Sequence, residues 1–225
     1  MSKFTVKKVP FKFIVTSGPT REFVDPIRFL SNPSTGKMGF CIAKAAVNLG
    51  YEVTYISGTV AAIFRDVKGA RNISVVSTRD MLDAVLSEVE SSSALIMAAA
   101  PADYRPEIQY DKKIKKTEAP SIKLIPNPDI LKTVDLKRTE LSLDKFFLVG
   151  FAAETHNVIE YAQGKLKSKN LDMIFLNDLT RQDSGFGVAT NQLYHFKKSG
   201  DYEKWESDSK EKLGYRIIEE VLEII

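Results

Sequence analysis

The chain has 225 residues, of which 44% are hydrophobic and 27% charged, and its formal net charge is +3. This composition is that of an ordinary globular protein with a substantial core, and the net charge is too small and too dispersed to predict nucleic-acid binding. No apolar run approaches the roughly 18 residues of a membrane span, and the start, MSKFTVKKVP, lacks the apolar stretch of a signal peptide. We therefore expect a cytoplasmic protein that binds neither nucleic acid nor membrane and forms a single domain over residues 1–225.

Predicted strands and helices alternate from the start of the chain, which is typical of a doubly wound, mostly parallel Rossmann-like α/β sheet. The helix that begins near Gly36 has an apolar stripe at 3.6-residue spacing and ends at Gly50, a C-terminal cap. The last helix is predicted to start at Asp208, which would cap it together with Glu211. The expected strands are 12–16, 52–57, 72–76, 94–98, 146–151 and 172–176, and the other expected helices run from 78 or 79 to 89 and from 157 to 169.

Two segments, 101–145 and 178–207, interrupt this alternation with proline, lysine and short extended pieces. We interpret both as excursions from the sheet. In the first, KKIKK (112–116) and SIKLIP (121–126) are predicted to be antiparallel strands, and in the second a hairpin is expected around residues 193–196. Projecting strands often make contacts between subunits, so we predict a homodimer that buries part of the second excursion.

The loop at residues 16–39, TSGPTREFVDPIRFLSNPSTGKMG, is far longer than the roughly two to six residues usual between a strand and a helix. In a parallel sheet it lies over the carboxyl edge, where ligands bind and a helix N-terminus offers N–H groups to anions. Its apolar residues predict that it packs down and displays its polar ones, although Gly18-Pro19 and Asn32-Pro33 alone would suit simple turns. The displayed residues would be Arg21, Asp25, Arg28, Asn32, Ser34, Thr35 and Lys37.

Two common phosphate-binding motifs are absent from this loop. The dinucleotide fingerprint requires Gly-x-Gly-x-x-Gly after the first strand and an acidic residue at the end of the second. Here the first turn reads SGPTR and the second strand ends in ISG. Gly36-Lys37 resembles the end of a Walker loop, but Met38 replaces the required Ser or Thr and Ser31 replaces the first Gly.

The segment AAAPAD (98–103) follows a buried predicted strand. Runs of alanine let a backbone and a ligand approach closely, and the carboxylate of Asp103 suits a ribose or a metal ion. The alternative is that the alanines only allow a helix to pack closely on the sheet.

Lysines recur in two pairs. In a strand, Lys113 and Lys115 would share a face, and Lys165 and Lys169 are four residues apart on a predicted helix. Adjacent ammonium groups repel each other unless an anion lies between them, so the two pairs suggest a polyphosphate ligand. The alternative for the first pair is a solvated edge strand whose charges prevent aggregation.

In order and at family-like spacing, six segments resemble the bacterial phosphopantothenate–cysteine ligase family, also called phosphopantothenoylcysteine synthetase, of coenzyme A biosynthesis. They are TSGPTREFVDPIRFLSNPSTGKMG, AAAPADYRP, KIKK, NPDIL, VGFAAET and KSKNLDMIFLND, and they cover almost the whole chain. In many bacteria this domain is fused behind a flavin-containing decarboxylase, so we expect either a free-standing ligase or one half of a fusion. The chain departs from the family at residues 33–35, PST for a common HSS, and at residues 100–102, APA for a common AVA.

The resemblance implies that 4'-phosphopantothenate and L-cysteine are joined. The carboxylate of phosphopantothenate would attack the α-phosphate of a nucleoside triphosphate, CTP rather than ATP, with release of pyrophosphate, and the cysteine amine would then attack the acyl-cytidylate. Mg²⁺ is expected because a triphosphate must be partly neutralised, and Asp103 is the candidate ligand. Two alternatives stay open, a nicotinamide-dependent oxidoreductase on a similar sheet and a non-catalytic nucleotide-binding or flavin-carrying module.

The resemblance also implies roles for single residues. Lys113 would neutralise the forming acyl phosphate, and Asn32 would stabilise the tetrahedral second step. Arg28, Asn32 and Ala99 would bind the acyl substrate. The nucleotide would be bound by Ser34, Thr35, Gly36, Ala98, Asp103, Lys113, Asn127, Asp129, Ile130, Phe151, Lys165 and Lys169.

Overall fold

The structure is a computed structural model that describes residues 11–116, 121–154, 157–178 and 188–225. Its centre is an eight-stranded sheet with the strand order β13-β12-β10-β9-β6-β1-β4-β5. Neighbouring strands are parallel, except that β12 is antiparallel to both β10 and β13. The strands of this sheet are β1 (Lys12–Ser17), β4 (Glu52–Ser57), β5 (Arg71–Ser74), β6 (Ser93–Met97), β9 (Phe146–Glu154), β10 (Met173–Asp178), β12 (Leu193–Lys197) and β13 (Tyr202–Lys204).

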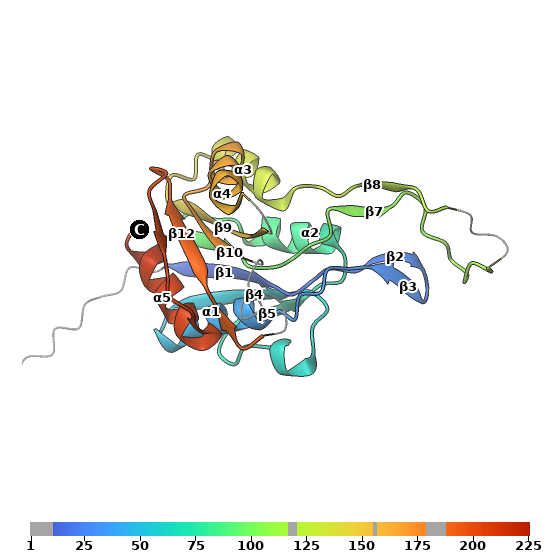
Figure 1. The fold of residues 1–225 in the computed structure, drawn as a ribbon, viewed down its shortest axis with the longest axis horizontal. Coiled ribbons are helices and arrows are strands. Elements are labelled where there is room, and N and C mark those ends of the chain that lie inside the picture. The colour runs from blue at the N-terminus through green and yellow to red at the C-terminus, as the bar shows by residue number, and fades with distance from the viewer. Residues whose placement is uncertain (1–10, 117–120, 155–156, 179–187) are drawn as a thin grey trace, which may run out of the picture.

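Helices cover both faces of the sheet (Figure 1). Successive side chains of a strand point to opposite faces, so Phe13 belongs to the buried cluster beneath α1 and α5, whereas Ile14 belongs to the cluster beneath α2, α3 and α4. The doubly wound, mostly parallel sheet expected from the sequence is confirmed. No helix within the described ranges is long and apolar enough to cross a membrane. The helices are α1 (Lys37–Asn48), α2 (Thr78–Glu88), α3 (Ile130–Glu140), α4 (Val158–Ser168) and α5 (Lys210–Leu222).

The ends of two helices test the predicted caps. Gly50 follows α1 with φ +81° and donates its N–H to the carbonyl of Val47 at 2.9 Å, so the expected glycine cap is confirmed. The predicted cap of α5 is wrong by one residue, because the hydroxyl of Ser209, rather than Asp208, accepts the N–H of Lys212 and caps the helix. The sequence did not predict α3, which lies inside the first excursion.

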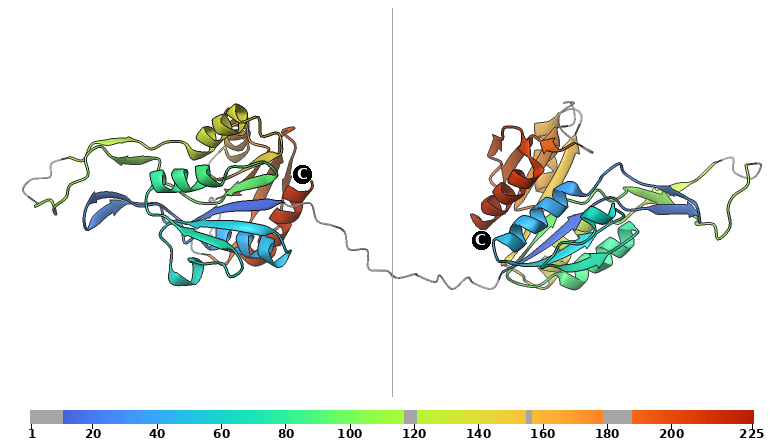
Figure 2. Two further views of the ribbon diagram at one scale, coloured as in Figure 1. Left: turned by 180° about the vertical axis from the view of Figure 1, so that it is seen from behind. Right: turned by 90° about the horizontal axis from the view of Figure 1, so that it is seen from below.

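An arm projects from the carboxyl edge of the sheet, as the three views in Figures 1 and 2 agree. It consists of two short antiparallel pairs of strands, together with the described part of the segment that joins the two strands of the second pair. The pairs are β2 (Glu22–Asp25) with β3 (Arg28–Leu30), and β7 (Tyr104–Pro106) with β8 (Leu124–Pro126).

Two predictions about the excursions are wrong. KKIKK (112–116) is not a strand but part of the loop between β7 and β8, and only the end of SIKLIP is extended, where β8 pairs with β7. The second excursion does not project in its described part, because β12 and β13 form a hairpin that widens the central sheet. The hairpin itself is therefore confirmed, while residues 179–187 lie outside the described residues.

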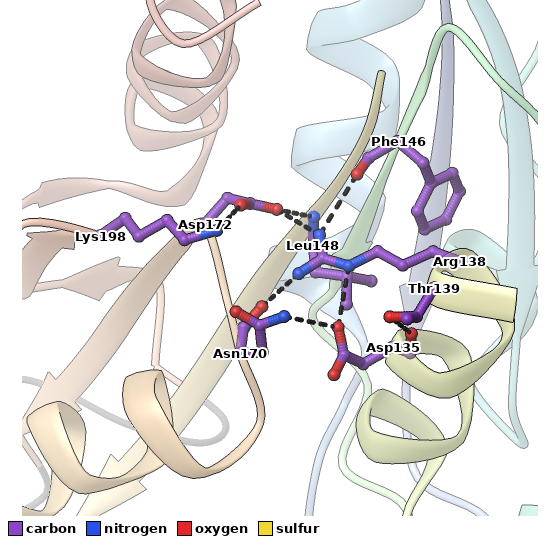
Figure 3. Close-up of polar contacts among 8 residues, drawn as sticks. All are labelled: Asp135, Arg138, Thr139, Phe146, Leu148, Asn170, Asp172 and Lys198. Atoms are coloured by element: carbon purple, nitrogen blue, oxygen red, sulfur yellow. Dashed lines mark hydrogen bonds and ion pairs between the residues drawn. The ribbon is translucent and has the colours of Figure 1, made fainter. Parts of the chain in front are cut away.

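A buried arginine joins three elements at the amino edge of β9 (Figure 3). Arg138, near the end of α3, is 9% exposed, and its guanidinium donates to Asp135 at 2.9 Å, to Asp172 at 2.6 Å and to the carbonyls of Phe146 and Asn170. Asp172 also accepts the N–H of Leu148 at 2.8 Å. The network therefore connects α3, β9 and the turn between α4 and β10.

We predict that Arg138→Gln lowers the free energy of unfolding by about 3 kcal/mol, because the mostly buried carboxylate of Asp172 loses its buried charged partner and keeps only the exposed Lys198. The matched control is Lys132→Gln, which removes an exposed lysine from the same helix and is expected to change stability by less than ~0.5 kcal/mol. Urea denaturation measures both variants. An Arg138 variant as stable as the control would contradict this role of the network.

Candidate functional site

A cavity of about 540 Å³ lies where the loops after β1 and β6 meet the carboxyl end of β9. This volume is in the range of small-molecule sites, and the position is the one at which open α/β sheets bind ligands. The structure thus brings together most of the residues that the sequence singled out. Those lining the cavity are Asn32, Ser34, Thr35, Gly36, Ala98, Ala99, Asp103, Asn127, Asp129, Ile130, Phe151, Lys165 and Lys169.

The start of α1 packs directly against the end of β1. Gly36 is the N-cap in a left-handed conformation, with φ +79° and no side chain to cap the helix. A Cβ at Gly36 would lie 2.6 Å from Val60, and one at Gly39 would lie 2.7 Å from the carbonyl oxygen of Thr16. The hydroxyl of Ser17 donates to the carbonyl of Gly36 at 2.7 Å. The first turn of α1 therefore presses against the end of β1, and Lys37, Met38 and Gly39 of this turn line the cavity.

The alanine segment is fixed against the opening loop. Thr16 accepts the N–H of Ala99 at 3.2 Å, and Ala100 donates its N–H to the carbonyl of Gly18 at 2.9 Å. The amide of Asn32 donates to the carbonyls of Ala100 and Pro101 at 3.2 and 3.0 Å. The amide nitrogen of Asn32 is therefore engaged in holding this loop, rather than directed only at a ligand.

The sequence analysis found only one member, Asn127, of a polar cluster at the cavity. The carboxylate of Glu22 accepts both the N–H and the hydroxyl of Thr78, at 2.9 and 2.8 Å. The hydroxyl of Thr78 also lies 2.9 Å from that of Thr20, which accepts the N–H of Ala102 at 2.9 Å. Asn127 donates to the carbonyl of Ala102 at 2.9 Å. We call Thr20, Glu22, Thr78 and Asn127 the polar cluster; the sequence analysis named Asn127, in the NPDIL segment, and missed the roles of the other three.

Lys165 and Lys169 line the cavity from the end of α4. Their position at a helix C-terminus is favourable for cations, and Lys169 pairs with Asp129 at 3.1 Å. Asp129 is also the N-cap of α3 and accepts the N–H of Lys132 at 3.2 Å. The lysine pair therefore has structural partners in addition to its place at the cavity.

Two further lysines border the cavity, Lys37 at the start of α1 and Lys210 at the start of α5. The sequence analysis named Lys37 only as a displayed residue and missed Lys210, because nothing in a linear pattern indicates that α5 begins beside α1. Burial, followed by the nearby charge of Lys37, lowers the pKa of Lys210.

Arg28 and Lys113 are not among the residues that line the cavity. Arg28 donates to Asp25 at 2.9 Å and to the carbonyl of Ile114 at 2.9 Å, and Ile114 donates its N–H to Asp25 at 3.1 Å. The Arg28 guanidinium holds the pKa of the Asp25 carboxyl well below its usual range. These contacts fix the segment that carries Lys113 to the β2–β3 pair of the arm, with the Lys113 side chain exposed.

Asp103 is exposed at the cavity. Among the described residues, the one group of three clustered His, Cys, Asp or Glu side chains is His195, Glu203 and Glu220, which does not include Asp103. Mg²⁺ usually retains several waters and binds one or two protein carboxylates together with substrate phosphates. Two carboxylates line the cavity, and because Asp129 pairs with Lys169, the exposed Asp103 is the one that fits this mode of binding.

Comparisons with known proteins agree on one family. The family model described as DNA/pantothenate metabolism flavoprotein C-terminal domain matches residues 10–225. The chain is 42% identical over 210 residues to the coenzyme A biosynthesis bifunctional protein CoaBC of Bacillus subtilis, a match that covers 92% of this chain and 50% of that protein. The chain thus spans about half the length of the curated relatives that it matches.

Solved structures give the same result. The C-terminal domain of coenzyme A biosynthesis bifunctional protein CoaBC is 37% identical with a TM-score of 0.77, over 94% of this chain and 93% of that chain. A Cab2 mutant in complex with phosphopantothenate-cysteine has the same fold at 15% identity, with a TM-score of 0.71 over 95% of this chain and 85% of that one. Since the family model covers nearly every residue, the chain belongs to the family of DNA/pantothenate metabolism flavoprotein C-terminal domains.

Proposed function

We propose that this chain is a phosphopantothenate–cysteine ligase of coenzyme A biosynthesis that acts in the cytoplasm as a single domain. The cavity at the carboxyl edge of the sheet carries the proposal. It is lined by residues of the opening loop and of the AAAPAD, NPDIL, VGFAAET and KSKN segments, so every motif of the resemblance except KIKK contributes to one site. Membership of the family supports the same activity.

In the first step, the carboxylate of 4'-phosphopantothenate attacks the α-phosphate of CTP and pyrophosphate leaves. Catalysis of phosphoryl transfer consists mainly of positioning and of stabilising charge on phosphoryl oxygens. The hydroxyls of Ser34 and Thr35, together with the first turn of α1, are suited to hold phosphate groups. The polar cluster fixes the alanine segment on the same cavity through hydrogen bonds to Ala102. The nucleotide is assigned to Ala98, Asp103, Asn127, Asp129, Ile130, Phe151, Lys165 and Lys169.

Asp103 is the residue that would hold Mg²⁺ at this cavity. When bound, the ion would neutralise part of the charge of the triphosphate. Lys165 and Lys169 supply positive charge to the same cavity from α4, and Lys169 would then share its ammonium between Asp129 and the nucleotide.

We expect phosphopantothenate, L-cysteine and CTP to give phosphopantothenoylcysteine, CMP and pyrophosphate, with slower turnover when ATP replaces CTP. Release of pyrophosphate with each triphosphate is the measurement. Equal rates would remove the preference for CTP, and release of CDP with inorganic phosphate would rule out an acyl-cytidylate. As a control for the oxidoreductase and flavin alternatives, CTP with Mg²⁺ should raise the melting temperature, whereas NADPH and FMN should not.

Asn32 is assigned to the second step, in which the cysteine amine attacks the acyl-cytidylate. Its amide lies within reach of both the cavity and the carbonyls of Ala100 and Pro101. An N–H of this amide can stabilise the oxyanion of the tetrahedral intermediate, in the way that donors of an oxyanion hole do. Arg28 and Ala99 are the other residues assigned to the acyl substrate.

Lys113 is assigned to the first step, although it lies on the arm. We therefore expect Lys113→Gln to block formation of the acyl-cytidylate, because a neutral amide cannot offset charge on the reacting phosphate; such a loss costs about 3 kcal/mol of barrier. Asn32→Asp should form the intermediate and stall, since a carboxylate repels the oxyanion. Mass spectrometry of each variant incubated with CTP, phosphopantothenate and Mg²⁺ measures the bound intermediate.

Lys116→Gln, which removes another exposed lysine of the same segment, is the control and should behave as the wild-type chain does. Accumulation of the acyl-cytidylate in the Lys113 variant, or its absence in the Asn32 variant, would contradict the assigned order of the two residues.

A homodimer would reconcile the position of Lys113 with this role. The arm projects from the sheet (Figure 2) and exposes large apolar side chains, which mark association surfaces. We therefore propose that the arm, rather than the second excursion, lies in the dimer interface and places Lys113 and Arg28 at the cavity of the partner subunit. The exposed apolar residues of the arm are Ile27, Phe29, Tyr104, Ile108, Tyr110, Ile122 and Leu124.

Mixing two inactive variants tests this arrangement. If Lys113 acts on the partner's cavity, subunit exchange between Lys113→Gln and Asn32→Asp dimers should create some intact cavities and restore about a quarter of wild-type activity. If both residues serve the cavity of their own chain, the mixture stays inactive. Light scattering on the wild-type chain provides the companion measurement, and a monomer at all concentrations would refute the dimer.

A further inference from the structure

Asp25, the last residue of β2, carries a carboxylate that is closed off from solvent although it lies on the projecting arm. Its side chain is 0% exposed, and a buried carboxylate is tolerated only where hydrogen bonds satisfy it. Oδ1 accepts the N–H of Ile27 at 3.0 Å and that of Arg28 at 2.9 Å, within the turn between β2 and β3. This oxygen therefore serves the local fold of the hairpin.

The other oxygen, Oδ2, binds groups outside the backbone of this turn. It accepts hydrogen bonds from Nε of Arg28 at 2.9 Å and from its Nη2. It also accepts the N–H of Ile114, 89 residues away in the sequence, at 3.1 Å. Nη2 of Arg28 donates in turn to the carbonyl of Ile114 at 2.9 Å. The pair of Asp25 and Arg28, which we call the arm clamp, thus binds both backbone polar groups of Ile114.

A second hydrogen bond holds the same segment to β2. Tyr110 donates its N–H to the carbonyl of Val24, which precedes Asp25, at 2.9 Å. Residues 110–114 are therefore attached to β2 at both ends, and Lys113 lies between the two attachments, directly before Ile114. Because its neighbour is anchored, Lys113 has less backbone freedom, and the region that its ammonium group can reach is smaller.

The arm clamp also holds the second cation of the arm. Arg28 keeps 47% of its side chain exposed while its guanidinium contacts Asp25 and Ile114. Among the residues assigned to the reaction, Arg28 and Lys113 are the two that do not line the cavity of their own chain. One buried carboxylate therefore fixes the spatial relation between these two residues.

We propose that Asp25 is a positioning residue of the ligase reaction, whose carboxylate holds Arg28 and the segment of Lys113 in one arrangement, so that both cations reach the same bound substrate. Arg28 then contacts the acyl substrate and Lys113 the reacting phosphate. Asp25 acts only through these two residues, because groups of the arm already occupy both of its oxygens. The proposal deepens the proposed function and rests on it for the roles of Arg28 and Lys113.

Asp25→Asn tests the proposal because all five hydrogen bonds to this carboxylate come from donors. An amide has one accepting oxygen, so its NH₂ group would face either the N–H groups of the turn or the donors of Arg28 and Ile114. The matched control is Asp111→Asn, which removes an exposed carboxylate from the same segment and should behave as the wild-type chain does.

Quenched-flow mixing with CTP, Mg²⁺ and saturating phosphopantothenate measures how fast the acyl-cytidylate forms. We expect Asp25→Asn to form it about 10- to 100-fold more slowly than the wild-type chain, because a reacting group misplaced by about 1 Å has an effect of this size. The KM for phosphopantothenate should also rise, through Arg28. The double variant Asp25→Asn/Lys113→Gln should be no slower than Lys113→Gln alone, whereas independent effects would multiply. Multiplied losses, or a wild-type rate in Asp25→Asn, overturn the proposal.

Amide hydrogen exchange, followed by NMR, gives a measurement that does not depend on activity. The N–H of Ile114 donates to Asp25 and should exchange faster in Asp25→Asn, whereas that of Tyr110, which donates to Val24, should change much less. Unchanged exchange at Ile114 also overturns the proposal.

The two measurements separate this proposal from the proposed function. If Ile114 exchanges faster in Asp25→Asn while the wild-type chain makes no phosphopantothenoylcysteine, the arm clamp is retained and the proposed function fails. If the wild-type chain is an active ligase and Asp25→Asn forms the acyl-cytidylate at the same rate, the proposed function stands and the positioning role of Asp25 fails.

Discussion

The geometry of the cavity depends on a buried carboxylate. Glu22 is 5% exposed, and a buried acid is tolerated only when hydrogen bonds satisfy it. Its partner Thr78 supplies an N–H and a hydroxyl, and Thr78 is linked through Thr20 to the backbone of Ala102. Because Glu22 also begins β2, the same contacts fix the base of the arm, the start of α2 and the alanine segment. Displacing the start of α2 would remove both of these hydrogen bonds from the buried Glu22 carboxylate.

Close packing of α1 on β1 also fixes the geometry of the cavity. Gly36 and Gly39 let α1 approach the end of β1 more closely than any side chain would permit, and the small residues Ala98 and Ala99, directly after β6, line the cavity. The positive features of the site come from three helices, since α1 and α5 present their starts and α4 presents lysines near its end. The site therefore combines the backbone N–H groups at the starts of helices with the ammonium groups of lysines.

The sequence predicts the sheet and most of the cavity because both follow from local rules. Residues at the carboxyl ends of parallel strands meet at one edge, which is why the segments around Asn32, Asp103 and Phe151 were found. These local rules do not predict which residues far apart in the sequence come together. Charge alternation could not show that Asp25 and Arg28 fix Lys113 to an arm, and α3 was missed because its polar sequence lies in a proline-rich and lysine-rich region. Lys210 was missed because its neighbours come from the other end of the chain.

The two outermost strands of the sheet limit how copies of this chain can meet. β13 spans Tyr202–Lys204, all exposed, and β5 spans Arg71–Ser74, with charged Arg71 exposed. Short strands with charged residues resist the addition of another strand, because hydrogen bonding along such an edge would bury ionic groups. The addition of a strand from another copy of the chain is therefore disfavoured at both edges of the sheet. Copies of this chain would therefore associate through surfaces other than the edges of the central sheet.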